Sequence, residues 1–218
     1  MIQGVIFDMD GLMFDTESAM LRGWLKAGEV LHYDITEELI LSVMGLVEEN
    51  ICQRFMERLG ADFPYEQVRD LQMRYVDEEM DTQGVPVKKG LFDLLEYLKQ
   101  SGMKTAVATS TARARAEKLL NLSGAMPYFD FVICGDMVHR GKPDPDIYLQ
   151  AAKALKLSPQ ECIGLEDSRN GIFSVYNAGM KAVMIPDLIQ PDKEMQAVIY
   201  REFEDLSRVI ALVEEENA

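Results

Sequence analysis

Two aspartates stand one residue apart where the first apolar run of the chain ends. Residues 5–7 are apolar, Asp8 and Asp10 come next, and Gly11 follows directly. In an extended strand, residues two apart point to the same side, so we expect both carboxylates to project together. Carboxylates so close repel each other unless a cation or a proton lies between them. The pair is a candidate metal or acid–base site, although Asp and Gly are also common in ordinary turns.

Polar residues also follow the later apolar runs. In an open parallel sheet, ligands bind outside the carboxyl ends of the strands, so the residues that follow each strand are the candidates. Each cluster alone is weak evidence, whereas their shared placement at one edge of a sheet is a strong signal. The four clusters are Asp8-Met9-Asp10-Gly11, Thr109-Ser110-Thr111, Gly141-Lys142-Pro143-Asp144 and Glu166-Asp167-Ser168.

The chemistry that these groups suit is phosphoryl transfer. Mg²⁺ prefers oxygen ligands, which Asp8, Asp167 and Glu166 would supply. The cation and Lys142 would neutralise the charge that develops on the phosphate oxygens. The Thr109 hydroxyl and backbone N–H groups at the start of the next helix would hold the remaining oxygens. One aspartate can attack phosphorus, and the other can act as general acid and then as base for water.

The apolar spacing changes after the first strand, which we expect over residues 2–7. Over residues 17–75 the apolar positions recur at helical spacing, and no convincing strand interrupts them. This pattern predicts a four-helix insert over residues 16–81. Its second helix is expected to begin at Asp34, with Glu37 three residues on in the manner of a capping box.

The rest of the chain alternates between short apolar runs and helical patterns. Such alternation is typical of an α/β fold with a doubly wound parallel sheet and a Rossmann-like core. We therefore expect a catalytic core domain of residues 1–15 plus 82–218 and a cap domain of residues 16–81. The further strands are expected over residues 103–108, 131–134, 162–165 and 182–185.

Composition excludes several classes of protein. No apolar run in the 218 residues approaches the ~20 residues that span a membrane, and no signal-peptide pattern opens the chain. The net charge of −15 argues against nucleic-acid binding. Cys52, Cys134 and Cys162 are widely spaced and odd in number, so we expect reduced thiols. These features predict a cytoplasmic protein without a membrane or nucleic-acid partner. We also expect a monomer, and the phosphoryl-transfer residues indicate a small phosphorylated metabolite as its partner.

Taken together, the four clusters resemble the signature of a known superfamily. The segments Asp8-Met9-Asp10-Gly11, Thr109, Lys142 and Glu166-Asp167 match, in order and spacing, the four motifs of the haloacid dehalogenase superfamily. The resemblance covers nearly the whole chain. The helical insert directly after the first motif is similar to the cap of the subgroup that includes β-phosphoglucomutases and phosphoglycolate-type phosphatases.

The resemblance implies a role for each catalytic and phosphate-binding residue. Asp8 would be the nucleophile, and Asp10 would be the general acid and base. Thr109 and the backbone of Ser110 would bind the phosphate that is transferred. Lys142 would bind the same phosphate and orient Asp8.

The resemblance also implies a Mg²⁺ site. Its ligands would come from Asp8, from the backbone carbonyl of Asp10, and from Glu166 and Asp167. The dehalogenase branch of the superfamily is disfavoured, because Asp10 marks the phosphoryl-transfer members and carbon–halogen cleavage needs no metal cluster.

Three functions are open on these residues. The first is a Mg²⁺-dependent phosphatase that hydrolyses small phosphomonoesters, such as sugar phosphates, through an aspartyl phosphate. The second is a sugar phosphomutase. It is weakened because Met20 stands where β-phosphoglucomutases carry a histidine, and Val47-Glu48 where they carry a Ser-Arg pair that grips the second phosphate. The third is a non-catalytic binding protein, against which every residue needed for the chemistry is present.

Overall fold

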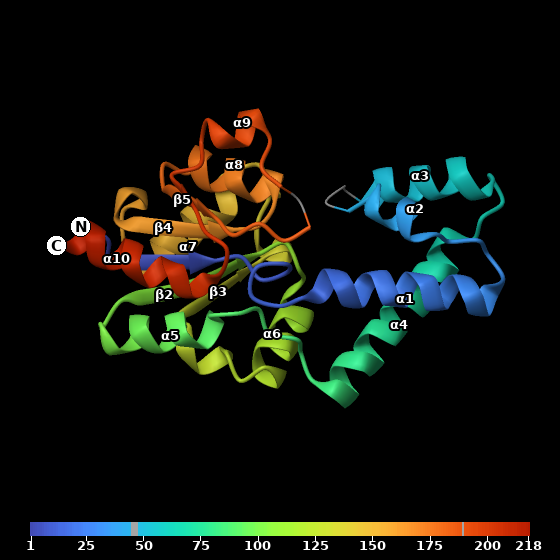
Figure 1. The fold of residues 1–218 in the computed structure, drawn as a ribbon, viewed down its shortest axis with the longest axis horizontal. Helices are drawn as coiled ribbons and strands as arrows, with labels where there is room; N and C mark the ends of the chain where they lie inside the picture. Colours follow the sequence, from blue (N-terminus) through green and yellow to red (C-terminus); the bar gives the residue numbers. More distant parts are fainter. Residues whose placement is uncertain (45–47, 189) are drawn as a thin grey trace. The chain divides into compact units, whose positions relative to one another are not determined.

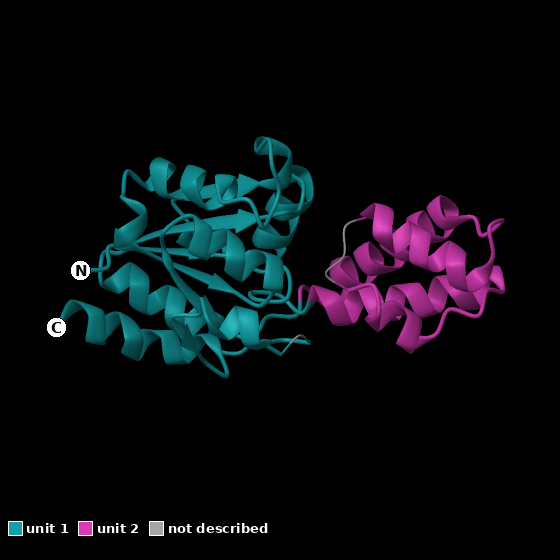
Figure 2. Cartoon of the chain, turned by 90° about the horizontal axis from the view of Figure 1, so that it is seen from above, with its two compact units in different colours: residues 1–15, 86–218 teal, residues 16–85 magenta. Residues whose placement is uncertain are grey.

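The chain folds as two compact units (Figure 2), and the computed structural model describes residues 1–44, 48–188 and 190–218. One unit comprises residues 1–15 and 86–218, and the other comprises residues 16–85. Helix α4 (Tyr65–Gln83) extends past residue 81, where the insert was predicted to end. The boundary between the two units falls after residue 85, and the division into domains stays a prediction.

The larger unit is built on a six-stranded sheet in which every neighbouring pair is parallel (Figure 1). The predicted α/β class is thereby confirmed. The sixth strand was not predicted, because two exposed residues carry no apolar pattern. In the order β3-β2-β1-β4-β5-β6, the strands are β3 (Phe131–Cys134), β2 (Lys104–Thr109), β1 (Gly4–Phe7), β4 (Cys162–Glu166), β5 (Lys181–Met184) and β6 (Arg201–Glu202).

Helices cover both faces of this sheet, with α7 and α8 on one face and α5 on the other (Figure 1). Burial on both faces explains why β1 is a continuous apolar run and not an alternating one. Ile6 belongs to the core under α7 and α8, and Phe7 packs edge-on against Phe129 with ring centroids 5.5 Å apart. The helices are α5 (Leu91–Gln100), α6 (Arg113–Leu122), α7 (Asp146–Leu155), α8 (Arg169–Asn177), α9 (Lys193–Gln196) and α10 (Val209–Asn217).

Short 3₁₀ turns complete the larger unit: η1 (Met126–Tyr128), η2 (Gly135–Met137), η3 (Pro159–Glu161) and η4 (Leu206–Arg208). Within the described ranges, no helix of either unit has both the length and the apolar character needed to cross a membrane. The cytoplasmic location, the monomeric state and the absence of a nucleic-acid partner stay predictions.

The smaller unit consists of helices in its described part: α1 (Thr16–Leu31), α2 (Glu37–Leu41), α3 (Glu48–Leu59) and α4. Helix α1 packs along α4, and Trp24 and Phe55 meet in the core with ring centroids 4.6 Å apart. The predicted start of the second helix was wrong. Thr36 is the N-cap, because its hydroxyl accepts a hydrogen bond from Leu39 N at 3.3 Å, whereas Asp34 lies two residues too early.

Candidate active site

The central strand β1 lies between β2 and β4, so the order of strands reverses at this point of the sheet. Ligands of doubly wound sheets bind at the carboxyl edge of such a reversal. Phe7 pairs in register with Val107 and with Leu165, and the N–H group of Asp8 donates to Leu165 O at 3.0 Å. The register therefore brings Asp8 out of β1 directly beside Glu166, the last residue of β4.

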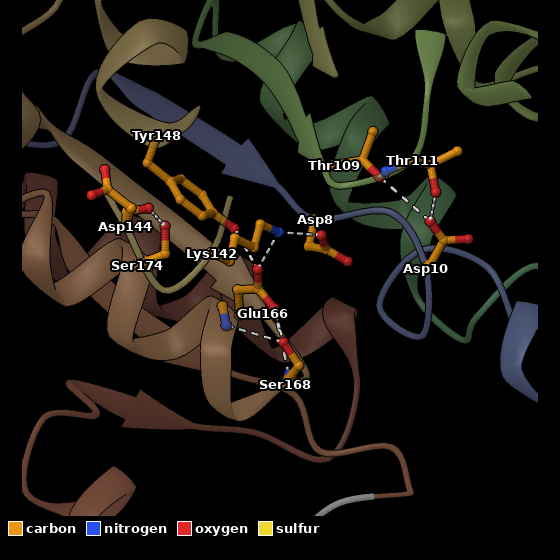
Figure 3. A network of polar contacts seen from close by, with 11 residues as sticks. Asp8, Asp10, Thr109, Thr111, Lys142, Asp144, Tyr148, Glu166, Ser168 and Ser174 are labelled. Atoms are coloured by element: carbon orange, nitrogen blue, oxygen red, sulfur yellow. Dashed lines mark hydrogen bonds and ion pairs between the residues drawn. The ribbon is translucent and has the colours of Figure 1, made fainter. Parts of the chain in front are cut away.

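Lys142 links these two carboxylates (Figure 3). Its ammonium donates to Asp8 Oδ1 and to Glu166 Oε1, the second contact at 2.5 Å. All three side chains are buried. Lys142 comes from the segment between η2 and α7, so three separate stretches of chain meet here. The predicted convergence of Asp8, Lys142 and Glu166 is present in the structure.

Burial and like charge govern the protonation of this group. Burial raises the pKa of the Asp8 carboxyl well above its usual value, and the charge of Glu166 raises it further, while Lys142 opposes both. Burial alone would lower the pKa of Lys142, but Asp8 and Glu166 together raise it above its ordinary value. Lys142 thus stays charged, and one ammonium faces more than one carboxylate. A cation bound beside these carboxylates would offset the like charge that raises the pKa of Asp8.

The donor set fits a metal ion. Asp8, Glu166 and Asp167 are all buried, and each offers a carboxylate oxygen within 4.8 Å of the others. An all-oxygen carboxylate set suits a hard divalent cation. Gly11 has φ +84°, and a Cβ there would lie 2.2 Å from Asp167 Oδ2, so the turn after β1 packs directly on that carboxylate. That the backbone carbonyl of Asp10 is a further ligand of this metal stays a prediction.

Two hydroxyl groups hold Glu166: that of Tyr148, which the sequence did not single out, and that of Ser168, the last residue of the fourth cluster. The hydroxyl of Tyr148 donates to Glu166 Oε1 at 2.8 Å, and the hydroxyl of Ser168 donates to Oε2 at 3.1 Å. A Cβ on Gly171 would lie 1.8 Å from the carboxyl carbon of Glu166, so the first turn of α8 also closes on it. In the sequence, the apolar spacing of α7 marks Tyr148 only as an aromatic residue of the core.

Asp10 is held by a different group of residues. The hydroxyl of Thr111 donates to Asp10 Oδ2 at 2.7 Å, and that of Thr109 donates to the same oxygen at 3.4 Å. Figure 3 shows Asp10 directed toward these threonines, while Asp8 faces Lys142. The two aspartates thus have different hydrogen-bond partners, and the turn at residues 11–13 follows Asp10. That their carboxylates project together stays a prediction.

The start of α6 follows the Thr109–Thr111 segment. Thr111 N donates to Thr109 Oγ1 at 3.0 Å, and Arg113 N donates to the Asp136 carboxylate at 3.2 and 3.3 Å. Asp136 therefore already uses one of the helix-start N–H groups that were expected to meet phosphate. Phosphate binding by Thr109, Ser110 and Lys142 stays a prediction.

The cap positions lie within the smaller unit. Met20 is part of α1, and Val47 lies outside the described residues. Glu48 begins α3, where its Oε1 accepts from the Tyr65 hydroxyl at 2.9 Å and pairs with Arg69 Nε at 2.6 Å. The negative charge of Glu48 is thus partly offset by Arg69 of the same unit.

Comparison with known proteins settles the family. The family described as haloacid dehalogenase-like hydrolase matches residues 5–185. The chain belongs to this family. The resemblance drawn from the four motifs is confirmed, and the metal dependence general to the family agrees with the acidic cluster of this chain.

Two relatives of this haloacid dehalogenase-like hydrolase carry phosphatase names. The chain is 31% identical over 184 residues to the phosphorylated carbohydrates phosphatase of Thermotoga maritima, with 84% of each chain covered. It is 30% identical over 184 residues to hexitol phosphatase A of Escherichia coli, covering 84% of this chain and 82% of that one. A crystal structure described as a putative β-phosphoglucomutase from Thermotoga maritima matches with a TM-score of 0.84 and 27% identity, covering 98% and 99% of the two chains.

Proposed function

We propose that this protein is a Mg²⁺-dependent phosphatase that hydrolyses small phosphomonoesters such as sugar phosphates. The observation that carries the proposal is the buried contact of Lys142 with Asp8 and Glu166, beside Asp167, at the carboxyl ends of β1 and β4. The phosphatase names of two relatives, both for phosphorylated carbohydrates or alcohols, support the substrate class.

The first step is attack by Asp8 on the phosphorus atom of the bound ester. Lys142 holds Oδ1 of Asp8, which leaves Oδ2 as the attacking oxygen. A bond forms between this oxygen and phosphorus while the bond from phosphorus to the leaving alcohol oxygen breaks. The Lys142 ammonium offsets negative charge on the phosphoryl oxygens, and the Thr109 hydroxyl would donate to another of them.

Asp10 carries the proton in both halves of the reaction. It gives a proton to the leaving alcohol oxygen, and it then removes a proton from the water that attacks the aspartyl phosphate. This second attack breaks the bond between Asp8 and phosphorus, restores the carboxylate and releases inorganic phosphate. Thr111 keeps the Asp10 carboxylate in one orientation through its 2.7 Å hydrogen bond.

The metal would be held by carboxylate oxygens of Asp8, Asp167 and Glu166, together with the Asp10 carbonyl. When bound, a divalent cation neutralises charge on the phosphoryl oxygens and aligns them. We assign Mg²⁺ because this hard cation prefers oxygen ligands and binds substrate phosphates as well as carboxylates.

The direct test is Mg²⁺-dependent phosphate release from sugar phosphates, hexitol phosphates, phosphoglycolate and nucleoside monophosphates, with Asp8→Asn as control. Release from a few members of this panel, lost in Asp8→Asn and in the absence of Mg²⁺, is the expected result. No release by the wild-type protein from any member would contradict the phosphatase.

A phosphomutase is the second candidate, favoured by the description of the matching crystal structure. It would convert β-glucose 1-phosphate to glucose 6-phosphate once a glucose bisphosphate is supplied, which ³¹P NMR resolves. Binding of phosphomonoesters with neither reaction would leave a binding protein on the same fold.

A further inference from the structure

Tyr148 places a neutral hydrogen-bond donor inside the charged cluster. Its side chain and that of Glu166 are both 0% exposed, and the hydroxyl reaches Glu166 Oε1 at 2.8 Å. The Lys142 ammonium shares the same oxygen at 2.5 Å and lies 5.2 Å from the centroid of the Tyr148 ring. Tyr148 thus contacts both Glu166 and Lys142.

The Tyr148 hydroxyl affects the balance between the two hydrogen bonds that the Lys142 ammonium makes, one to Asp8 and one to Glu166. Glu166 is fully buried, so its charge needs hydrogen-bond donors from the protein. With Tyr148 supplying one donor to Oε1, Lys142 need not satisfy that oxygen alone. Without the hydroxyl, the ammonium would be drawn toward Glu166 and away from Asp8. Burial, followed by the charge of Glu166, raises the pKa of Tyr148 well above its usual value, so the hydroxyl keeps its proton.

The same three residue types meet elsewhere in this unit. Tyr200 donates to Glu216 Oε1, and Lys181 donates to Glu216 Oε2 and lies 4.4 Å from the centroid of the Tyr200 ring. Lys181 is the first residue of β5, at the edge of the sheet opposite to the candidate site. This second trio lies nearer the surface, where Tyr200 is 36% exposed, and offers a control for the loss of one tyrosine hydroxyl away from the site.

We propose that Tyr148 is a positioning residue, whose hydroxyl fixes Glu166 so that the Lys142 ammonium is retained on Asp8. The inference rests on the proposed function, because it assigns Tyr148 to the reaction in which Asp8 attacks phosphorus. It acts through Glu166 and Lys142 and makes no contact with the substrate.

The experiment compares Tyr148→Phe with Tyr200→Phe in the full chain. Each variant loses one hydroxyl that donates to a glutamate, and thermal unfolding reports the stability of both. The kinetic readout is kcat and KM for a phosphomonoester that the wild-type protein hydrolyses. The second readout is the ¹⁵N–¹H NMR signal of the Lys142 ammonium, recorded in the metal-free protein and therefore independent of activity.

Loss of one positioning hydrogen bond predicts a fall in kcat of about threefold to tenfold in Tyr148→Phe, with KM within about twofold of wild type. The Lys142 signal is expected to shift in this variant, and Tyr200→Phe is expected to change neither readout. Because the effect acts through Glu166, Tyr148→Phe added to Glu166→Gln should lower kcat no further.

An unshifted Lys142 signal with unchanged kcat in Tyr148→Phe would overturn the inference and leave Tyr148 as a packing residue. Additive losses in the Tyr148→Phe and Glu166→Gln double variant would also overturn it. If the wild-type protein shows no phosphatase activity but Tyr148→Phe still shifts the Lys142 signal, the proposed function is contradicted, whereas the effect of Tyr148 on Lys142 is upheld.

Discussion

The hydroxyl of Thr111 donates a 2.7 Å hydrogen bond to the carboxylate of Asp10. Asp10 is the proposed acid and base, so its orientation should govern the rate of proton transfer and not the binding of substrate. Thr111→Val, which has nearly the same shape and no hydroxyl, is expected to lower kcat about tenfold with little change in KM. Steady-state kinetics on the best substrate of the panel measures both constants.

Two further variants accompany Thr111→Val. Thr111→Ser keeps the hydroxyl and should retain most of the activity. Thr82→Val removes an exposed hydroxyl that donates to Glu78 O at 2.7 Å within α4, and it should leave kcat unchanged. Equal kcat in Thr111→Val and wild type would show that Asp10 does not depend on this bond.

Substitution of Gly11 and of Gly124 by alanine distinguishes the effect of backbone strain from the effect of displacing Asp167. Both have positive φ, +84° and +78°, but a Cβ on Gly11 would lie 2.2 Å from Asp167 Oδ2, whereas one on Gly124 meets nothing within 4 Å. Gly11→Ala and Gly124→Ala should each lose roughly 1–2 kcal/mol of unfolding free energy from left-handed strain. Only Gly11→Ala should also weaken Mg²⁺ binding, about tenfold or more by titration calorimetry. Equal Mg²⁺ affinities in the two variants would contradict a metal role for Asp167.

Asp205 gives the fold a pH-dependent contribution away from the site. Its carboxylate accepts from Lys89 Nζ at 2.7 Å and from Ser207 N at 3.0 Å. The hydrogen bonds from Lys89 and from the Ser207 hydroxyl lower the pKa of Asp205 to about 2, against about 3.9 in an unfolded chain. Because the folded-state pKa is the lower one, the stabilisation is complete above roughly pH 5 and is lost as the pH falls toward about 2.

At pH 7, Asp205→Asn should therefore have a free energy of unfolding about 1–2 kcal/mol below that of wild type, measured by urea denaturation. The difference in unfolding free energy between this variant and wild type should narrow as the pH falls from 5 to 3. Lys89→Met removes the partner charge and should show the same narrowing. A gap between Asp205→Asn and wild type that stays constant over this range would contradict the assignment.

Much of the sheet was predictable, because each buried strand is an apolar run and parallel strands are buried on both faces. Strand β3 was predicted at Phe131–Cys134, as observed. Strand β6 was missed, since its two exposed residues extend the sheet by backbone pairing alone. The start of α2 was misplaced because Asp34 and Thr36 both suit an N-cap, and only the backbone path decides which side chain reaches Leu39 N.

The site was predictable as far as strand ends could place it. Asp8 follows β1 and Glu166 ends the neighbouring β4, and Lys142 follows a third apolar run of the same parallel sheet, so all three were expected at one edge. Tyr148 could not be found in this way, because it lies within a helix, where an aromatic residue usually signals core packing. Its contact with Glu166 depends on how α7 is rotated against β4, which a one-dimensional pattern does not specify.

The central claim is that Asp8 becomes phosphorylated during turnover. Rapid acid quenching of the enzyme with Mg²⁺ and substrate, followed by borohydride reduction, converts an acyl phosphate to homoserine that peptide mass spectrometry locates. We predict conversion at Asp8 during turnover and no conversion when Mg²⁺ is left out. Phosphate release at the full rate with Asp8 unmodified at every quench time would contradict the account.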